Sequence, residues 1–93
     1  MPPADQKPYQ TTMVFDEKTL PKALRRGHST KAGVWGLVRV LEGELWLRFT
    51  DGRAQLLMAG TAGIVRPQEI HWVEPVDRVQ MQVEFYERPP LAD

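Results

Sequence analysis

Two histidines, His28 and His71, are the side chains in this sequence best suited to bind a metal ion or to exchange a proton near neutral pH. Imidazole is the commonest metal ligand in proteins and titrates close to neutrality without help from its surroundings. A structural role is the alternative for each residue. His71 would then pack beside Trp72 and bond to backbone, and His28 would lie exposed in a loop. The residues alone leave both alternatives open.

Glu84 lies in a segment where polar and apolar residues alternate. Val79, Met81, Val83 and Phe85 occupy one set of positions, and the positions between them hold Gln80, Gln82 and Glu84. Successive side chains of a strand point to opposite faces, so this pattern predicts one apolar and one polar face. The polar face of an antiparallel sheet is usually open to solvent.

Composition excludes several other classes of site. The chain has 93 residues, enough for one domain, with 12 Lys and Arg balanced by 12 Asp and Glu. This balance lacks the basic field that nucleic-acid binding needs. The absence of cysteine excludes disulfides, thiolate metal sites and cysteine nucleophiles, and it fits a cytoplasmic protein. No apolar run approaches the ~20 residues that span a bilayer, so no membrane partner is expected.

Short strands separated by glycine or proline turns account for most of the chain. The alternation predicts seven or eight strands, with tight turns at Glu42-Gly43 and Asp51-Gly52 and one turn of helix around residues 22–26. A flexible arm is expected at residues 1–10 and a frayed tail at 88–93. The pattern is typical of an all-β antiparallel sandwich or small barrel over residues 11–87.

Two segments, VLEGELWLRF and GTAGIVRPQEIHWVEP, resemble the cupin barrel. More narrowly, RRGHSTKAGVWGLVRVLEG, PQEIHWVEP and MQVEFYE resemble the small TehB/YeaR-like cupin domains associated with tellurite resistance. This resemblance covers residues 11–87. It implies a small single-domain cupin-like antiparallel β-barrel or jelly roll.

The general cupin ligand positions are only partly filled. With Gly43 as the last glycine of the first cupin motif, the carboxylate position falls on Gly36 and a histidine position on Lys31 or Ala32. None of these is a good metal ligand. In the second motif, the spacing from Gly60 places a histidine at position 71, as the pattern requires. The first metal motif is therefore either lost or rebuilt around His28.

The resemblance implies a two-histidine, one-carboxylate metal site if the polar strand face points into the barrel. His28, His71 and Glu84 would hold a divalent ion such as Zn, Fe, Ni or Mn, with no other cofactor expected. Surface exposure of Glu84 is the alternative.

Three further residues are expected to contact a bound small molecule or oxyanion. They are Lys31, as a cation at the barrel mouth, Gln82, and Trp35 as an aromatic contact. For Lys31 the alternative is an ordinary surface position, and for Trp35 it is the core or a dimer interface.

Three functions fit these residues. The first is a non-enzymatic binding protein for a metal ion or small ligand, acting in the response to tellurite, other oxyanions or nitrosative stress. The second is a mononuclear metal enzyme of the oxygenase or isomerase type, which would need three or four strong ligands. The third is an interaction module without a site. An open sheet edge in so small a domain also predicts a homodimer.

Overall fold

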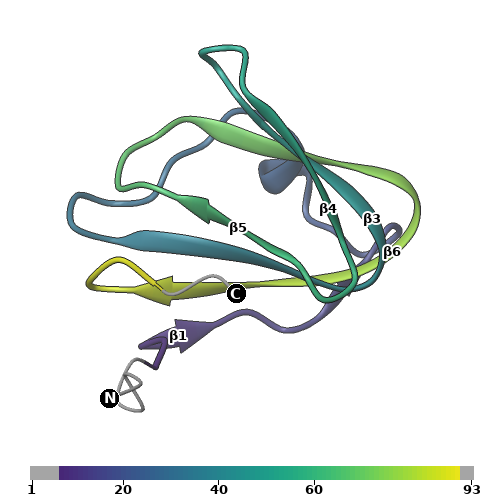
Figure 1. Ribbon diagram of the computed structural model, residues 1–93, viewed down its shortest axis with the longest axis horizontal. Helices are drawn as coiled ribbons and strands as arrows, with labels where there is room; N and C mark the ends of the chain where they lie inside the picture. The colour runs from purple at the N-terminus through teal and green to yellow at the C-terminus, as the bar shows by residue number, and fades with distance from the viewer. Residues whose placement is uncertain (1–6, 91–93) are drawn as a thin grey trace.

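Two long antiparallel strands form the centre of the fold. The computed structural model describes residues 7–90, and within them β3 (Trp35–Phe49) pairs with β6 (His71–Tyr86) along nearly its whole length. The paired residues run from Trp35 opposite Tyr86 to Phe49 opposite His71. Figure 1 shows the two strands side by side, bending together. Every other strand pairs with one of these two.

Irregular pairing in the middle of β3 replaces the tight turn predicted at Glu42-Gly43. The register shifts between Val40 and Glu42 and again between Gly43 and Leu45, while the strand continues through both shifts. Gly43 has φ +81°, and a Cβ there would lie 1.9 Å from the carbonyl oxygen of Arg78. The glycine therefore serves a bulge and a close approach of β6, and the hairpin prediction is wrong.

The remaining strands flank the central pair. On one edge of β3, β4 (Ala54–Met58) pairs with residues 44–48 and β5 (Ala62–Val65) with residues 36–39. On the far edge of β6 lie β1 (Gln10–Thr11) and β2 (Phe15–Asp16). The predicted hairpin at Asp51-Gly52 is confirmed: Gly52 has φ +95° and joins β3 to β4.

The all-β antiparallel class is confirmed, and the described residues form six strands. Fewer strands appear than the seven or eight expected, because β3 and β6 each unite two predicted strands. The strand order β1-β6-β3-β4 has two ends, so within residues 7–90 the sheet is not closed into a barrel. A cupin jelly roll stays a prediction.

Alternation along the long strands places the core on one face of the bent sheet. Val79, Met81 and Val83 are buried, whereas Gln80 is exposed and Gln82 half-buried, as the pattern predicts. Alternation also accounts for a second group of buried residues on β3 and β4, namely Leu45, Leu47, Phe49 and Leu57.

Short connections complete the fold. The expected helical turn is a 3-10 helix, η1 (Lys22–Arg25). Asp16 begins the turn that precedes it, because its carboxylate accepts hydrogen bonds from the backbone N–H groups of Lys18 and Thr19, both at 2.8 Å. Of the predicted arm and tail, residues 1–6 and 91–93 lie outside the described residues. Gln10 already belongs to the sheet, opposite Phe85.

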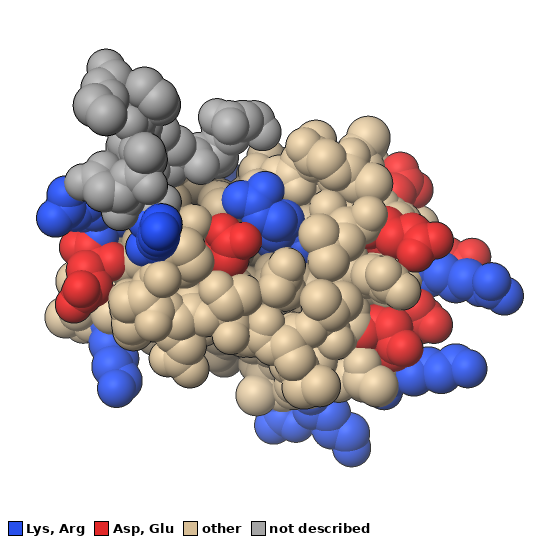
Figure 2. Space-filling view, turned by 90° about the horizontal axis from the view of Figure 1, so that it is seen from below, with Lys and Arg blue, Asp and Glu red and all other residues tan. Residues whose placement is uncertain are grey.

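Surface charge is mixed. On the face shown in Figure 2, blue basic and red acidic side chains lie near one another, with uncharged residues between the groups. This distribution agrees with the balanced composition. None of the helices in the described part of the chain is long and apolar enough to cross a membrane.

Candidate functional site

His28 and His71 lie side by side. The loop between η1 and β3 carries His28 to the first residue of β6, where the two residues exchange backbone hydrogen bonds of 3.0 and 2.9 Å. Their ring centroids are 4.1 Å apart with the rings tilted by 54°. On its other side, His71 pairs with Phe49 of β3. The expectation that a loop could bring His28 beside His71 is therefore confirmed.

Each imidazole is oriented by a backbone carbonyl. Nδ1 of His28 lies 2.9 Å from the carbonyl oxygen of Arg26, and Nδ1 of His71 lies 2.8 Å from that of Glu69. A carbonyl oxygen only accepts hydrogen bonds, so Nδ1 carries the proton in both rings. In the neutral tautomer, Nε2 is then the free acceptor or metal-binding nitrogen.

Burial lowers the pKa of His71 below its ordinary value of 6.5. The hydrogen bond from Nδ1 to Glu69 opposes this effect, and the neighbouring His28 adds to it. His71 is 5% exposed, so a charged ring would lose most of its hydration. At neutral pH the ring of His71 is consequently neutral, with its Nε2 unprotonated.

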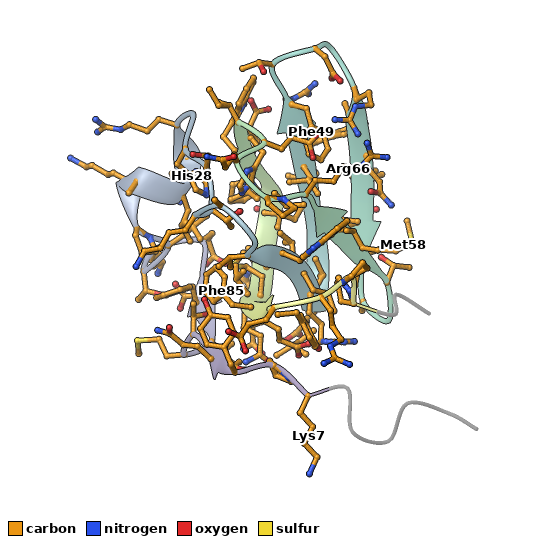
Figure 3. All side chains as sticks on the ribbon, turned by 90° about the vertical axis from the view of Figure 1, so that its left-hand side faces the viewer. Lys7, His28, Phe49, Met58, Arg66 and Phe85 are labelled. Atoms are coloured by element: carbon orange, nitrogen blue, oxygen red, sulfur yellow. The ribbon has the colours of Figure 1, made fainter. Side chains whose placement is uncertain are left out.

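Both histidines line a cavity of about 310 Å³ on the concave side of the sheet. Figure 3 labels two of its lining residues, His28 on the loop after η1 and Phe85 on β6. Buried apolar side chains form the interior of the cavity: Val38, Val65, Val73, Met81 and Val83. Exposed residues mark its mouth: Tyr9, Gln10, Ser29 and Lys31. This combination of apolar walls and a few polar groups is typical of small-molecule sites.

Thr30 connects the loop that precedes β3 to the loop that precedes β6. Its hydroxyl donates a hydrogen bond to the carbonyl of Val34 at 2.7 Å and accepts one from the backbone N–H of Gln68 at 3.3 Å. Gln68 has φ +62°, a left-handed conformation that is unusual for a residue with a side chain. Neither the positioning role of Thr30 nor that of the Glu69 carbonyl is evident from the sequence, because no local pattern marks such a role.

Glu84 is not part of this cavity. Its carboxylate accepts hydrogen bonds from Nε of Arg39 at 2.9 Å and from the hydroxyl of Tyr86 at 2.7 Å. The neighbouring strand positions Val83 and Phe85 line the cavity, so Glu84 points to the opposite face. The structure thus does not bring the predicted carboxylate to the two histidines.

The hydrogen bonds of Glu84 change two pKa values. Burial acts to raise the pKa of Glu84, but the hydrogen bonds from Arg39 and Tyr86 and the charge of Arg39 outweigh it and lower the pKa. Burial, together with the hydrogen bond to Glu84 and its charge, raises the pKa of Tyr86 to about 12. The pair is therefore a carboxylate and a neutral phenol at neutral pH, which suits a structural contact.

Of the three residues predicted to contact a ligand, only Lys31 lines the cavity. Lys31 is at the cavity mouth. The side-chain amide of Gln82 donates to the carbonyl of Thr12 at 3.3 Å, and Trp35 is half-buried at the start of β3. Among the described residues, neither Gln82 nor Trp35 lines the cavity.

A divalent ion of the kind the cupin resemblance implies would need more ligands than the cavity provides. Within residues 7–90, no group of three or more His, Cys, Asp or Glu side chains could hold a metal ion. The two imidazoles alone do not form the expected two-histidine, one-carboxylate set. Metal binding stays a prediction that rests on two ligands.

The fold and the cavity define a small all-β domain with a mainly apolar pocket and a histidine pair in its wall. The TehB-like domain family matches residues 10–83, so the chain belongs to this family. The crystal structure of TehB from Haemophilus influenzae is similar, with 27% sequence identity and a TM-score of 0.77 over 85% of this chain. That match covers 30% of TehB, so the chain spans less than a third of TehB's length.

Two other crystal structures share the fold. A protein from E. coli strain K12 is 18% identical, with a TM-score of 0.81 over 98% of both chains. A protein from Neisseria meningitidis is 12% identical, with a TM-score of 0.57 over 89% of this chain and 88% of its own. Among curated proteins, none matches the chain.

Proposed function

We propose that this TehB-like domain binds a small molecule in its cavity, with His28 and His71 as the polar contacts, as a binding step in the response to tellurite, other oxyanions or nitrosative stress. The cavity of about 310 Å³, with the histidine pair in its wall, is the observation that carries the binding function. Family membership supports the stress role. Binding requires no reaction, and we propose none.

Phenol is a suitable first probe, because it combines an apolar ring with one polar group. We expect its addition to shift the backbone NMR signals of cavity residues such as Val73 and Val83, with little change on the opposite face. Binding should also raise the melting temperature in a concentration-dependent way, because the ligand stabilises only the folded state.

Gly36→Val tests the location of the site. Gly36 lines the cavity, and a Cβ there would meet Val65 at 3.5 Å, an ordinary contact. The added side chain should narrow the cavity without unfolding the protein, and the phenol-induced shifts should weaken. Ala62→Val, on β5 at a position that does not line the cavity, is the matched control. Equal binding by both variants would contradict the proposed site.

A divalent ion on the histidine pair is the second candidate. It is favoured by one observation: the Nδ1 groups of His28 and His71 are both held by carbonyls, an arrangement that metal-bound histidines commonly show. The two residues would supply neutral Nε2 ligands, and other molecules would have to complete the coordination. Calorimetric titration of metal-free protein with Zn²⁺ tests this. Binding that His71→Asn abolishes supports the candidate, and identical titrations of both proteins contradict it.

A further inference from the structure

One nitrogen of His71 remains available to a ligand. Among the described residues, every buried side-chain nitrogen and oxygen atom has a hydrogen-bond partner. In this part of the chain His71 makes a side-chain hydrogen bond only through Nδ1, so Nε2 is not a fully buried atom. His71 lines the cavity, so a ligand bound there would lie beside this ring. With Nδ1 protonated, Nε2 accepts a hydrogen bond from a ligand hydroxyl.

The charge around the cavity favours an anion. Lys31, at the mouth, is the one lysine or arginine among the described lining residues, and no aspartate or glutamate is among them. Among the Lys, Arg, Asp and Glu side chains, the described cavity lining therefore carries only the positive charge of Lys31. An anionic group at the mouth would remain partly hydrated while it pairs with Lys31, so it would avoid the large desolvation penalty of a buried charge.

The cavity interior between His71 and Lys31 is apolar. Val38, Val65 and Val73 come from three different strands, and each is at most 3% exposed. An inorganic oxyanion would make no apolar contacts with these valine side chains and would lose hydration on entering the cavity. An apolar ligand body would instead gain from burial against them.

We propose that the ligand is a small hydroxy acid, whose apolar body fills the cavity, whose hydroxyl donates a hydrogen bond to Nε2 of His71 and whose carboxylate pairs with Lys31. This inference rests on the proposed small-molecule function and adds the chemical class of the ligand. Both ends of the molecule are required for full affinity.

A matched series of ligands tests this class. The probes are 4-hydroxybenzoate and the longer 3-(4-hydroxyphenyl)propionate, with benzoate lacking the hydroxyl and phenol lacking the carboxylate. We expect at least one hydroxy acid to bind about tenfold more tightly than benzoate and than phenol in calorimetric titrations, the factor that one good hydrogen bond or ion pair supplies. Equal affinity across the series would overturn the proposal.

Variants of His71 and Lys31 test which residue binds the hydroxyl and which binds the carboxylate of the ligand. Asn at position 71 retains a side-chain amide that can donate to the carbonyl of Glu69 and lacks an equivalent of Nε2. His71→Asn should therefore reduce hydroxy-acid affinity to the level of benzoate and leave benzoate binding unchanged. Lys31→Gln should reduce the affinity for the hydroxy acid to the affinity for phenol. Lys18→Gln, at a position outside the cavity lining, should leave the affinity for the hydroxy acid unchanged. Equal losses in the Lys31 and Lys18 variants would overturn the role of Lys31.

The unmodified protein provides a readout that does not depend on the folding of a variant. The ¹⁵N chemical shift of His71 Nε2 should move when a hydroxy acid binds and should not move with benzoate. An unchanged shift at saturation would overturn the hydroxyl contact. If phenol binds but no hydroxy acid binds more tightly, the ligand class is wrong and the proposed function stands. If no probe binds, both fail.

Discussion

Gly36 and Gly43, both on β3, differ in whether they tolerate a side chain. Gly36 has space for a Cβ and no positive φ, whereas Gly43 has φ +81° and faces the Arg78 carbonyl. We expect Gly36→Ala to raise the free energy of unfolding by about 0.5–1 kcal/mol, because alanine loses less backbone entropy in a strand. Gly43→Ala should lower it by about 1–3 kcal/mol through backbone strain alone. Urea denaturation of both variants measures the difference, and similar values would contradict the bulge described above.

His71 makes stability depend on pH. Its pKa is lowered in the folded protein, so below the ordinary value of 6.5 the unfolded chain binds a proton that the folded chain does not. The stabilising contribution is complete above about pH 6.5 and is lost as the pH falls toward the folded pKa. We expect the free energy of unfolding to decrease between pH 7.5 and 5.5.

The His71→Asn variant isolates this effect. It should show a shallower decrease over the same range, because it lacks the group that takes up the proton. The carboxylates with lowered pKa values, such as Glu84, titrate below their ordinary value of 4.5 and affect a more acidic range. Identical slopes in the two proteins would contradict the assignment to His71.

At the scale of elements, two ion pairs join β3 to β6 on the face opposite the cavity. The Arg39–Glu84 pair has a carboxylate that is 14% exposed, and the Arg48–Glu74 pair has one that is 46% exposed. We expect Glu84→Ala to lower the free energy of unfolding by about 1–3 kcal/mol, because its partly buried hydrogen bonds to Arg39 and Tyr86 are lost. Glu74→Ala should lower it by no more than about 1 kcal/mol, since solvent screens the pair.

The same variants test the separation of the two faces. Glu84→Ala should leave phenol and Zn²⁺ binding unchanged, because Glu84 points away from the histidines. Calorimetry on the folded variant provides the measurement. A loss of Zn²⁺ binding in Glu84→Ala but not in Glu74→Ala would restore the three-residue metal site that the sequence predicts.

At the scale of the whole molecule, the open sheet leaves β4 at one end of the strand order. Leu56 and Met58 on this strand are 36% and 43% exposed. An unpaired edge with apolar side chains is a site for pairing with another chain. The homodimer stays a prediction. Light scattering should give a dimer mass for the wild-type protein and a monomer mass for Leu56→Lys, and a monomeric wild type at all concentrations would contradict it.

Local sequence patterns by themselves determined the strand character, the apolar face of residues 79–85 and the Asp51-Gly52 hairpin. Alternation and turn chemistry depend on neighbouring residues, so they can be recognised without a structure. The motifs around His28 and His71 also sufficed to indicate the family, which the match over residues 10–83 shows.

Which distant residues contact one another became clear from the three-dimensional structure. Strand alternation separates Glu84 from Val83, but which of the two faces is concave depends on the bulges near Gly43 and on pairing with distant strands. The bridge between His28 and His71 depends on a loop that ends against β6. Such long-range contacts come from the packing of the whole chain, and no local pattern encodes them. For this reason the histidine pair is brought together at the cavity, and the carboxylate expected beside it forms an ion pair on the opposite face.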